Sequence, residues 1–323
     1  HEVKIVTLMK GNDFEKILKS NNIGLIVRNF KSFNGFYSFF HLFKKEKPDL
    51  IISFMFAANI ISRLVKLTYK IPIITSVRAN NMSPHYKILY KLTYKIDDYS
   101  TFNSEYSFEN LIKNNLAVPS KSVVINNAIE IDKDIQRLNY ALPKTINLIS
   151  IAHFRPSKDY KTLFRAIKIV KGNGYKVKLN VLGNLDKQSW PLKMLKELKI
   201  QEEVKLIGFT NNTKEYLDKS DILILSSFLE GTPNALLEAM SRKLPVIASN
   251  IPGNDFVVEN SNGGYLFKIQ DEKDLAEKIT KVASISSEER KNLGNNGFQY
   301  VLENYELNHV LSQWLQLIRK IIC

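Results

Sequence analysis

The sequence predicts an α/β protein with two domains, each built around a parallel β-sheet. Three observations carry this prediction. The chain has 323 residues, more than the roughly 250 at which a single hydrophobic core stops growing. Short β-rich runs alternate with amphipathic stretches along the chain, as in repeated strand–helix units. A polar segment, residues 129–145, separates two series of such units and contains a proline near its end.

Each series contains six expected strands, with helices filling the gaps between them. The first six are residues 2–8, 23–27, 49–55, 72–77, 99–103 and 122–126, and the second six are residues 146–152, 177–183, 203–209, 221–227, 245–249 and 264–267. After residue 270 only helical patterns remain. We therefore expect a first domain over 1–128, a connector over 129–145, a second domain over 146–304, and a C-terminal helix over 305–323 that packs back on the domains.

Composition narrows the classes of protein that this chain can represent. Hydrophobic residues make up 44% and charged residues 24%, as in an ordinary globular protein. The one cysteine, Cys323, supports neither a disulfide framework nor a cysteine-ligated zinc site, which fits a reducing compartment such as the cytoplasm. The apolar run at residues 50–62 is too short for a membrane span. The chain starts at His1 directly before an expected strand, so we expect a truncated N-terminus that lacks one strand–helix unit.

The net charge is +14, and the first 128 residues contribute most of it, with 18 Lys and Arg against 9 Asp and Glu. Excess positive charge attracts phosphates in nucleotides, nucleic acids or anionic membranes, and does not choose among them. A basic nucleic-acid-binding protein is therefore one interpretation. No recognised nucleic-acid-binding motif supports it, so nucleic acid is not among the partners we expect.

The most informative segment is residues 226–240, SSFLEGTPNALLEAM, which follows an expected strand. Thr232 is a plausible N-cap and Pro233 suits the first position of a helix that runs to about Lys243. The N-terminus of such a helix is suited to an anion, for instance a phosphate. Glu230 before the helix and Glu238 within it could bracket an elongated ligand by accepting hydrogen bonds from its hydroxyls. The alternative is that both carboxylates are ordinary solvated charges.

This segment resembles the signature of glycosyltransferase family 4, which has two glutamates eight positions apart. That family consists of retaining enzymes with two Rossmann-like domains facing across a cleft, the B-type glycosyltransferase fold. The resemblance implies that Glu230 contacts the hydroxyls of the transferred sugar and Glu238 the ribose of the nucleoside. It also implies that substrate contacts come from the residues around them, namely Gly231, Thr232, Asn234, Ala235 and Leu236.

A second match to the family begins at Ile151, in IAHFRPSKDYKTL. The family has Gly-Arg-Leu here, followed four positions later by Lys; Lys158 matches that lysine, while His153 replaces the arginine and Arg155 stands two places on. An arginine and a lysine at this position could clamp a diphosphate. The segment at 207–225 resembles the family's nucleoside-contacting region, which includes Gly208. The resemblance thus implies that Arg155, Lys158 and Glu230 are catalytic, and that His153 and Gly208 bind substrate.

We therefore expect a retaining glycosyltransferase that moves a sugar from a nucleotide-sugar donor to a glycan or lipid-linked saccharide, in bacterial surface polysaccharide synthesis. The donor belongs to the second domain and the acceptor to the first, where Arg78 follows a strand and could hold an acceptor phosphate. We expect no cofactor and no metal, because the five histidines show no ligand spacing. The alternative is a non-catalytic remnant, or a truncated gene product, that binds nucleotide sugars without transferring them.

Aromatic residues gather at residues 30–43 and are followed by Lys44, Lys45 and Lys47. We expect half of these aromatics to lie in the core. The others, beside the lysines, could seat the protein on an anionic membrane as an interfacial helix. This would place a cytoplasmic protein peripherally on the inner face of the cell membrane.

Overall fold

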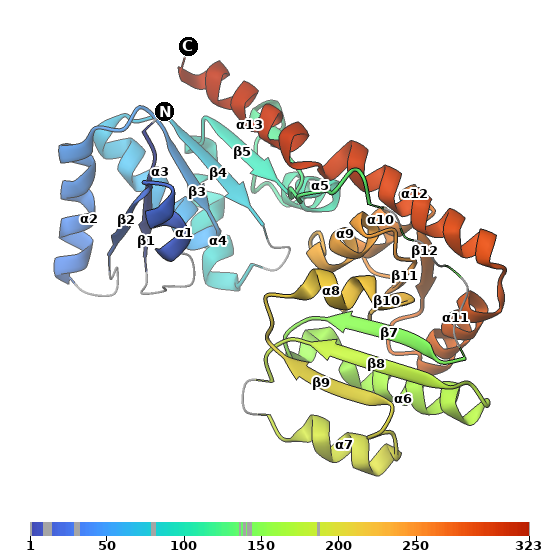
Figure 1. Ribbon diagram of the computed structural model, residues 1–323. Coiled ribbons are helices and arrows are strands. Elements are labelled where there is room, and N and C mark those ends of the chain that lie inside the picture. The colour runs from blue at the N-terminus through green and yellow to red at the C-terminus, as the bar shows by residue number, and fades with distance from the viewer. Residues whose placement is uncertain are drawn as a thin grey trace. The chain divides into compact units, whose positions relative to one another are not determined.

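The computed structural model describes residues 2–8, 15–28, 33–78, 82–135, 137, 140, 144–185 and 188–322 (Figure 1). The chain forms two compact units. The first comprises His1–Phe102, Phe108–Val123 and Leu317–Cys323, and the second comprises Asn103–Ser107 and Val124–Gln316. The domain boundaries expected at residues 128, 145 and 304 stay a prediction.

The strands of the first unit lie in two separate parallel arrangements. Strands β1 (Lys4–Thr7) and β2 (Gly24–Val27) pair with each other. The other sheet has the order β3 (Ile51–Phe54), β4 (Ile73–Val77), β5 (Tyr99–Phe102) and β6 (Ser122–Val124). The helices are α1 (Glu15–Ser20), α2 (Phe33–Glu46), α3 (Phe56–Tyr69), α4 (Pro84–Thr93) and α5 (Glu105–Lys113). All six expected strands of the first series are thus present, and a further strand before them stays a prediction.

Helix α2 packs into the core of the first unit. Phe39 and Phe43 are 5% and 8% exposed and cluster with Ile61, Val65 and Ile71. Their rings meet edge to face, with centroids 4.9 Å apart, a favourable aromatic arrangement. The expectation that half of the aromatics at 30–43 belong to the core agrees with these two; Phe30 and the side chains of residues 33–36 lie outside the described part.

The second unit is built on one six-stranded parallel sheet with the order β12-β11-β10-β7-β8-β9, part of which is visible in Figure 1. The strands are β7 (Ile146–Ile151), β8 (Val177–Leu182), β9 (Val204–Gly208), β10 (Ile222–Leu225), β11 (Val246–Ser249) and β12 (Gly264–Phe267). Each coincides with an expected strand to within two residues. The helices between them are α6 (Tyr160–Gly172), α7 (Trp190–Leu198), α8 (Thr213–Asp218), α9 (Asn234–Ser241) and α10 (Asn254–Ser261).

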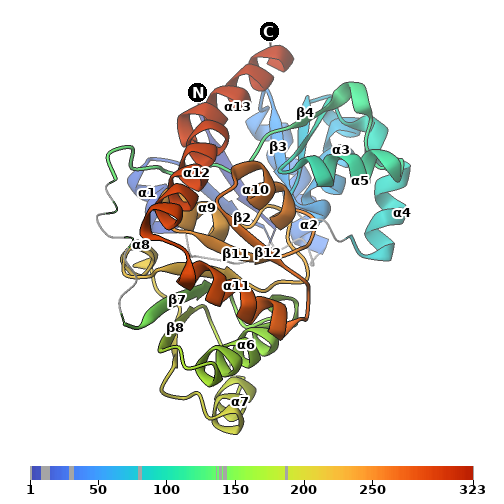
Figure 2. The ribbon, with the colours of Figure 1, turned by 90° about the vertical axis from the view of Figure 1, so that its right-hand side faces the viewer.

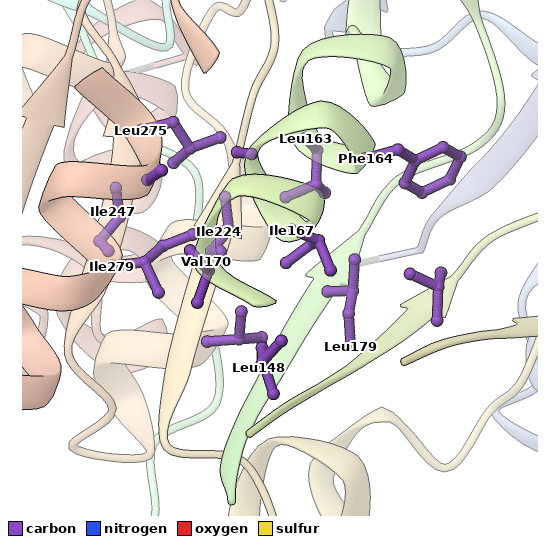
Figure 3. Close-up of a cluster of buried hydrophobic side chains, with 14 of the residues drawn as sticks. Leu148, Leu163, Phe164, Ile167, Val170, Leu179, Ile224, Ile247, Leu275 and Ile279 are labelled. Carbon is purple, nitrogen blue, oxygen red and sulfur yellow. The ribbon is translucent and has the colours of Figure 1, made fainter. Parts of the chain in front are cut away.

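Helices cover both faces of this sheet, because successive side chains of a strand point to opposite faces. On one face, Leu148, Leu179 and Ile224 pack against Leu163 and Ile279, which come from α6 and α11 (Glu272–Ser284) (Figure 3). Figure 2 shows α6 and α11 beside each other in front of the strands. On the other face, residues of the same strands pack against α9, α10 and α12 (Ser287–Tyr305). Because all six strands run parallel, their carboxyl ends share one edge of the sheet.

Two further helices follow α11, as the helical patterns after residue 270 predict. A capping box starts α12: the Ser286 side chain accepts from the Glu289 N–H, and the Glu289 carboxylate accepts from the Ser286 N–H. The last helix, α13 (Leu307–Ile322), buries Val310 and Leu317. Within the described residues, no helix combines the length and apolar character that crossing a bilayer requires.

Candidate functional site

The candidate site lies in the second unit, in loops at the carboxyl edge of the sheet. Open parallel sheets bind their ligands at this edge. The loop after β7, the loop after β10 and helix α9 carry ten of the twelve expected residues, and Gly253 in the loop after β11 lies against the loop after β10. The contacts between these loops show which of the expected side chains lie together.

Lys158 and Glu230 meet as an ion pair, although 72 residues separate them in the sequence. Lys158 Nζ lies 2.5 Å from Glu230 Oε1, and the two side chains are 22% and 12% exposed. The Ser227 hydroxyl donates to the same carboxylate oxygen at 2.6 Å. The ammonium group of Lys158 and the hydroxyl of Ser227 thus orient the Glu230 carboxylate, which stays within reach of solvent. Such a pair can bind a ligand that carries both hydroxyls and an anionic group.

Further hydrogen bonds tie the loop that carries Lys158 to the loop that carries Glu230. The Phe228 N–H donates to the Ser157 carbonyl at 2.8 Å, and the Ser226 hydroxyl donates to the Lys158 carbonyl at 2.9 Å. Arg155 lies one turn before Lys158: its carbonyl accepts from the Lys158 N–H at 2.9 Å, and its side chain is exposed. The two cations expected to act on a diphosphate therefore lie on one short loop.

The start of α9 differs from the expected one. Pro233, not Thr232, is the N-cap, and the helix runs over Asn234–Ser241 instead of reaching Lys243. The Thr232 hydroxyl donates to the Asn103 carbonyl of the same unit, so it does not cap the helix. The helix ends early because Lys243 has a φ of 54°, which is incompatible with an α-helix.

Helix α9 still begins directly after the loop that carries Glu230. Pro233 provides no side-chain cap, so the positive end of the helix is not neutralised there by a capping oxygen. The Asn234 side-chain oxygen accepts from Asn127 Nδ2 at 2.8 Å. Leu236 is fully buried in the core, so its backbone, and not its side chain, is the part that a ligand could contact.

Glu238 lies one turn into α9 and is partly buried. Burial raises the pKa of its carboxyl group, an effect that the positive charge of Lys214 opposes. The local structure therefore disfavours the ionised form that would accept hydrogen bonds from a ligand. A partly buried carboxyl group with a raised pKa is a candidate for a ligand-binding residue.

His153 and Gly208 connect the loops after β7, β8 and β9. His153 is exposed, and its Nδ1 accepts from the Asn184 N–H at 3.1 Å. The Gly208 carbonyl accepts from the Gly183 N–H at 2.9 Å, and Gly208 has a φ of 84° that favours glycine. These contacts hold three neighbouring loops in one arrangement at the carboxyl edge.

Residues of the loop after β11 were not among the expected site residues. The Ser249 hydroxyl donates to the Ser227 carbonyl, and Asn254 Nδ2 donates to both oxygens of Ser249 at 3.1 Å. A Cβ on Gly253 would lie 2.1 Å from the Gly231 carbonyl oxygen, so this backbone touches the loop of Glu230. The one signal in the sequence is a proline–glycine turn directly after the strand at 245–249.

Arg78 lies in the first unit, at the carboxyl end of β4. Its Nε donates to the Ser76 hydroxyl at 2.9 Å, and its guanidinium lies 5.7 Å from the ring centroid of Phe54. Burial lowers the pKa of Arg78 from its ordinary value. Asn80 and Asn81, which follow it, lie outside the described residues. Within the described ranges no cluster of three or more His, Cys, Asp or Glu residues could hold a metal ion.

Two Rossmann-like units with parallel sheets define the class of this protein, which has the B-type glycosyltransferase fold. Anabaena Alr3699/HepE, solved in complex with UDP and glucose, superposes with a TM-score of 0.83 at 16% identity, over 98% of this chain and 91% of that one. A glycosyltransferase from Rickettsia africae ESF-5 superposes with a TM-score of 0.86 at 20% identity, over 100% and 90%.

The family follows from the sequence match. Residues 132–300 of the 323 match the family described as glycosyl transferases group 1, and the chain belongs to this family. The matched range contains Lys158, Glu230 and Glu238. This protein is therefore a glycosyltransferase.

Similar proteins include enzymes of lipid-linked saccharide and capsule synthesis. A GalNAc-alpha-(1->4)-GalNAc-alpha-(1->3)-diNAcBac-PP-undecaprenol alpha-1,4-N-acetyl-D-galactosaminyltransferase of Campylobacter jejuni is 26% identical over 340 residues, 99% of this chain and 91% of that protein. The capsular polysaccharide biosynthesis glycosyltransferase CapM of Staphylococcus aureus is 26% identical over 280 residues, 79% and 72%. An uncharacterized glycosyltransferase of Methanocaldococcus jannaschii is 27% identical over 271 residues, 75% of this chain, and the chain spans 66% of its length.

Proposed function

We propose that this protein is a retaining glycosyltransferase of family 4 that transfers a sugar from a nucleotide-sugar donor to a glycan or lipid-linked saccharide. The observation that carries the proposal is the ion pair of Lys158 and Glu230 next to the N-terminus of α9. Similar proteins support the substrate classes: one was solved with UDP and glucose, and another is named for an undecaprenol diphosphate-linked acceptor. The name of CapM supports a role in bacterial surface polysaccharide synthesis.

In this proposal the second unit stabilises the departing nucleoside diphosphate. The bond between the anomeric carbon and the diphosphate oxygen breaks while the oxygen of the acceptor hydroxyl bonds to the same carbon from the same face, without a covalent enzyme intermediate. The proton of that hydroxyl passes to the departing diphosphate. Negative charge then grows on the leaving phosphate. Arg155, Lys158 and the first N–H groups of α9 stabilise this charge, Glu230 holds the hydroxyls of the sugar, and Glu238 holds the ribose.

These protein cations do the work that a metal ion does in other enzymes that cleave diphosphates, so we propose a reaction without a metal cofactor. Addition of EDTA is then expected to leave the transfer rate unchanged. In the first unit, Arg78 is proposed to hold a phosphate of the acceptor. Arg78→Ala is expected to raise the KM for the acceptor and to spare donor binding; the opposite pattern would refute this role.

The test is donor hydrolysis or transfer, followed by mass spectrometry with a panel of nucleotide sugars. Lys158→Ala and Glu230→Ala are each expected to lower kcat by about 100-fold, because each removes a charged group next to the reacting centre. Lys168→Ala changes an exposed lysine of α6 and serves as the matched control. Rates of the first two variants that equal the control would overturn the assignment. Calorimetric binding of a nucleotide sugar, with no turnover on any acceptor, would support the non-catalytic remnant instead.

We further propose that the protein contacts an anionic membrane surface from the cytoplasmic side. The sequence placed this contact at residues 30–43, where Phe39 and Phe43 are buried, so we propose α4 in its place. Tyr90 is the one buried residue of this helix, and Ile88 and Leu92, each two positions from it, are 64% and 77% exposed. Two positions correspond to about 200° around a helix, so both side chains point away from the side that Tyr90 anchors. Lys87 and Lys91 lie beside them, and the helix contains no acidic residue.

Vesicle sedimentation tests this contact. The double variant Ile88→Ser, Leu92→Ser is expected to bind phosphatidylglycerol vesicles about tenfold more weakly than the parent protein, because two exposed apolar side chains are lost. Leu192→Ser, at an exposed leucine of α7, is the control. Equal binding of all three proteins, or binding to zwitterionic vesicles of the same strength, would contradict the proposal.

A further inference from the structure

A hollow of about 530 Å³ lies in the first unit, between the end of β2 and one side of α2. Among the described residues, its polar lining consists of Arg28, which directly follows β2, and of Tyr37, Ser38, His41, Lys45 and Glu46 from α2. Its volume falls within the range of pockets that bind small ligands. Arg28 lies at the carboxyl end of a parallel strand, where open α/β sheets bind their ligands, while Glu46 pairs with Lys4 at the start of β1. None of these residues belongs to the site in the second unit.

Arg28 has a buried donor that no described protein group satisfies. Its Nη1 donates to the Val27 carbonyl at 3.1 Å, but its Nε is buried and has no hydrogen-bond partner among the described residues. A buried guanidinium N–H without a partner costs free energy, and an anionic oxygen at that position would remove the cost. Guanidinium groups are also the groups that bind phosphate through paired hydrogen bonds.

The charges around the hollow favour an anion. His41 and Lys45 are four positions apart and therefore on the same side of α2, and both line the hollow together with Arg28. In the described part of the chain, the lining has one carboxylate, Glu46, and it is already paired: Lys4 Nζ lies 2.5 Å from its Oε2. This hydrogen bond holds the pKa of Glu46 below its ordinary value, and the charge of Lys45 acts in the same direction. Lys4 also lies 3.0 Å from Glu2 Oε1, so two carboxylates share its charge. The charged groups that the described residues contribute to the lining are therefore Arg28 and Lys45 against the single carboxylate Glu46, so positive charge is in excess.

We propose that this hollow binds a phosphate-bearing ligand, with Arg28 and Lys45 contacting the phosphate oxygens and Tyr37 donating through its hydroxyl. The diphosphate of a nucleotide-sugar donor is assigned above to the second unit. If that proposed function holds, the ligand of the hollow is a different molecule. Two sources have the required chemistry: a diphosphate-linked lipid other than the acceptor assigned to Arg78, and a soluble phosphate ester. The binding claim itself does not depend on sugar transfer.

Calorimetry with inorganic pyrophosphate tests the proposal. All proteins carry Lys158→Ala, so that the cation of the second unit does not contribute. In this background, Arg28→Gln and Lys45→Gln are each expected to weaken pyrophosphate binding about tenfold, since each removes a charge-assisted hydrogen bond. Lys44→Gln is the matched control, because Lys44 is the exposed neighbour of Lys45 and does not line the hollow. Circular dichroism checks the fold of each variant; should Arg28→Gln unfold, the exposed Lys45 still gives a result.

A short polyprenyl diphosphate, measured with the same proteins, distinguishes the two sources. Tighter binding of this probe than of pyrophosphate, lost in Lys45→Gln, supports a lipid-linked ligand. Equal binding of both probes supports a soluble phosphate ester. The proposal is overturned if Lys45→Gln and Lys44→Gln bind pyrophosphate equally well, or if the Lys158→Ala protein binds none. Failure of the proposed transfer reaction, by contrast, would appear in the donor assays and leave these titrations unchanged.

Discussion

At the scale of single residues, Glu238 lowers the free energy of unfolding as the pH rises toward neutral. The same residue lies in a position that suits ligand binding. Burial raises the pKa of its carboxyl group in the folded protein. The folded state therefore binds this proton more tightly than the unfolded state does. By linkage, the contribution of Glu238 to the free energy of unfolding is greatest at low pH and falls as the pH rises from the unfolded pKa through the folded pKa. In the folded protein, the ionised form of this carboxyl group is therefore a cost to stability.

The first prediction follows from this cost. Glu238→Gln is expected to raise the melting temperature at pH 7 and to remove part of the decline in stability between acidic and neutral pH. The same change is expected to weaken binding of a nucleoside diphosphate about tenfold, because a charged acceptor is lost. Scanning calorimetry and titration calorimetry measure the two effects. The exposed Glu277→Gln is the control, and a destabilised Glu238→Gln protein would contradict the argument.

At the scale of elements, the loops after β10 and β11 behave as one structure. Asn254 donates to Ser249, the Ser249 hydroxyl donates to Ser227, and Gly253 lies against the backbone of Gly231. Ser227 in turn orients the Glu230 carboxylate. Asn254 is completely buried, so this contact is part of the core and not of a mobile surface. The position of Glu230 therefore depends on a loop about twenty residues further along the chain.

The second prediction tests this dependence by adding one methyl group. Gly253→Ala is expected to abolish most donor turnover, because its Cβ would lie 2.1 Å from the Gly231 carbonyl oxygen and the loop must move. Gly174→Ala is the matched control: Gly174 also has a positive φ, of 86°, but nothing lies within 4 Å of an added Cβ. Both variants are expected to lose about 1–2 kcal/mol of stability to backbone strain. Equal turnover in the two variants would show that the contact does not position Glu230.

At the scale of the whole molecule, the two units differ in how their strands are joined. The second unit has one six-stranded sheet with a hydrophobic cluster on each face. In the described part of the first unit, a pair of strands and a four-stranded sheet are separate, so more strand edges lack a hydrogen-bonding neighbour. Segments with fewer cooperative contacts open at lower free energy.

The third prediction is that limited proteolysis cuts the first unit before the second. Cleavage is expected before residue 128, with a resistant fragment from about residue 145 onward, because opening of the first unit costs less free energy. Mass spectrometry of the early products identifies the cut positions. First cuts within the six-stranded sheet, or equal resistance of both units, would show that the separate sheets do not weaken the first unit.

The strands could be predicted well because their signal is local. Within the described residues all twelve expected strands are present, and Gly264–Phe267 has the expected bounds. The start of α9 could not be predicted, because the residue that occupies the Thr232 hydroxyl, Asn103, is distant in the sequence. Which aromatics at residues 30–43 lie in the core could not be predicted either. Hydrophobicity alone does not say whether Phe43 meets a core or a membrane.

By itself, the sequence determined the twelve strands, the division into two series and the residue types around Glu230, because these depend on spacing along the chain. Only the tertiary structure decided that Lys158 and Glu230 form an ion pair, that Ser249 and Asn254 support them, and that Arg28 lines a basic hollow with α2. The physical reason is that hydrogen bonds and ion pairs act over a few ångströms in space. The chain folds residues from distant loops to within that range, and their separation in sequence does not reveal it.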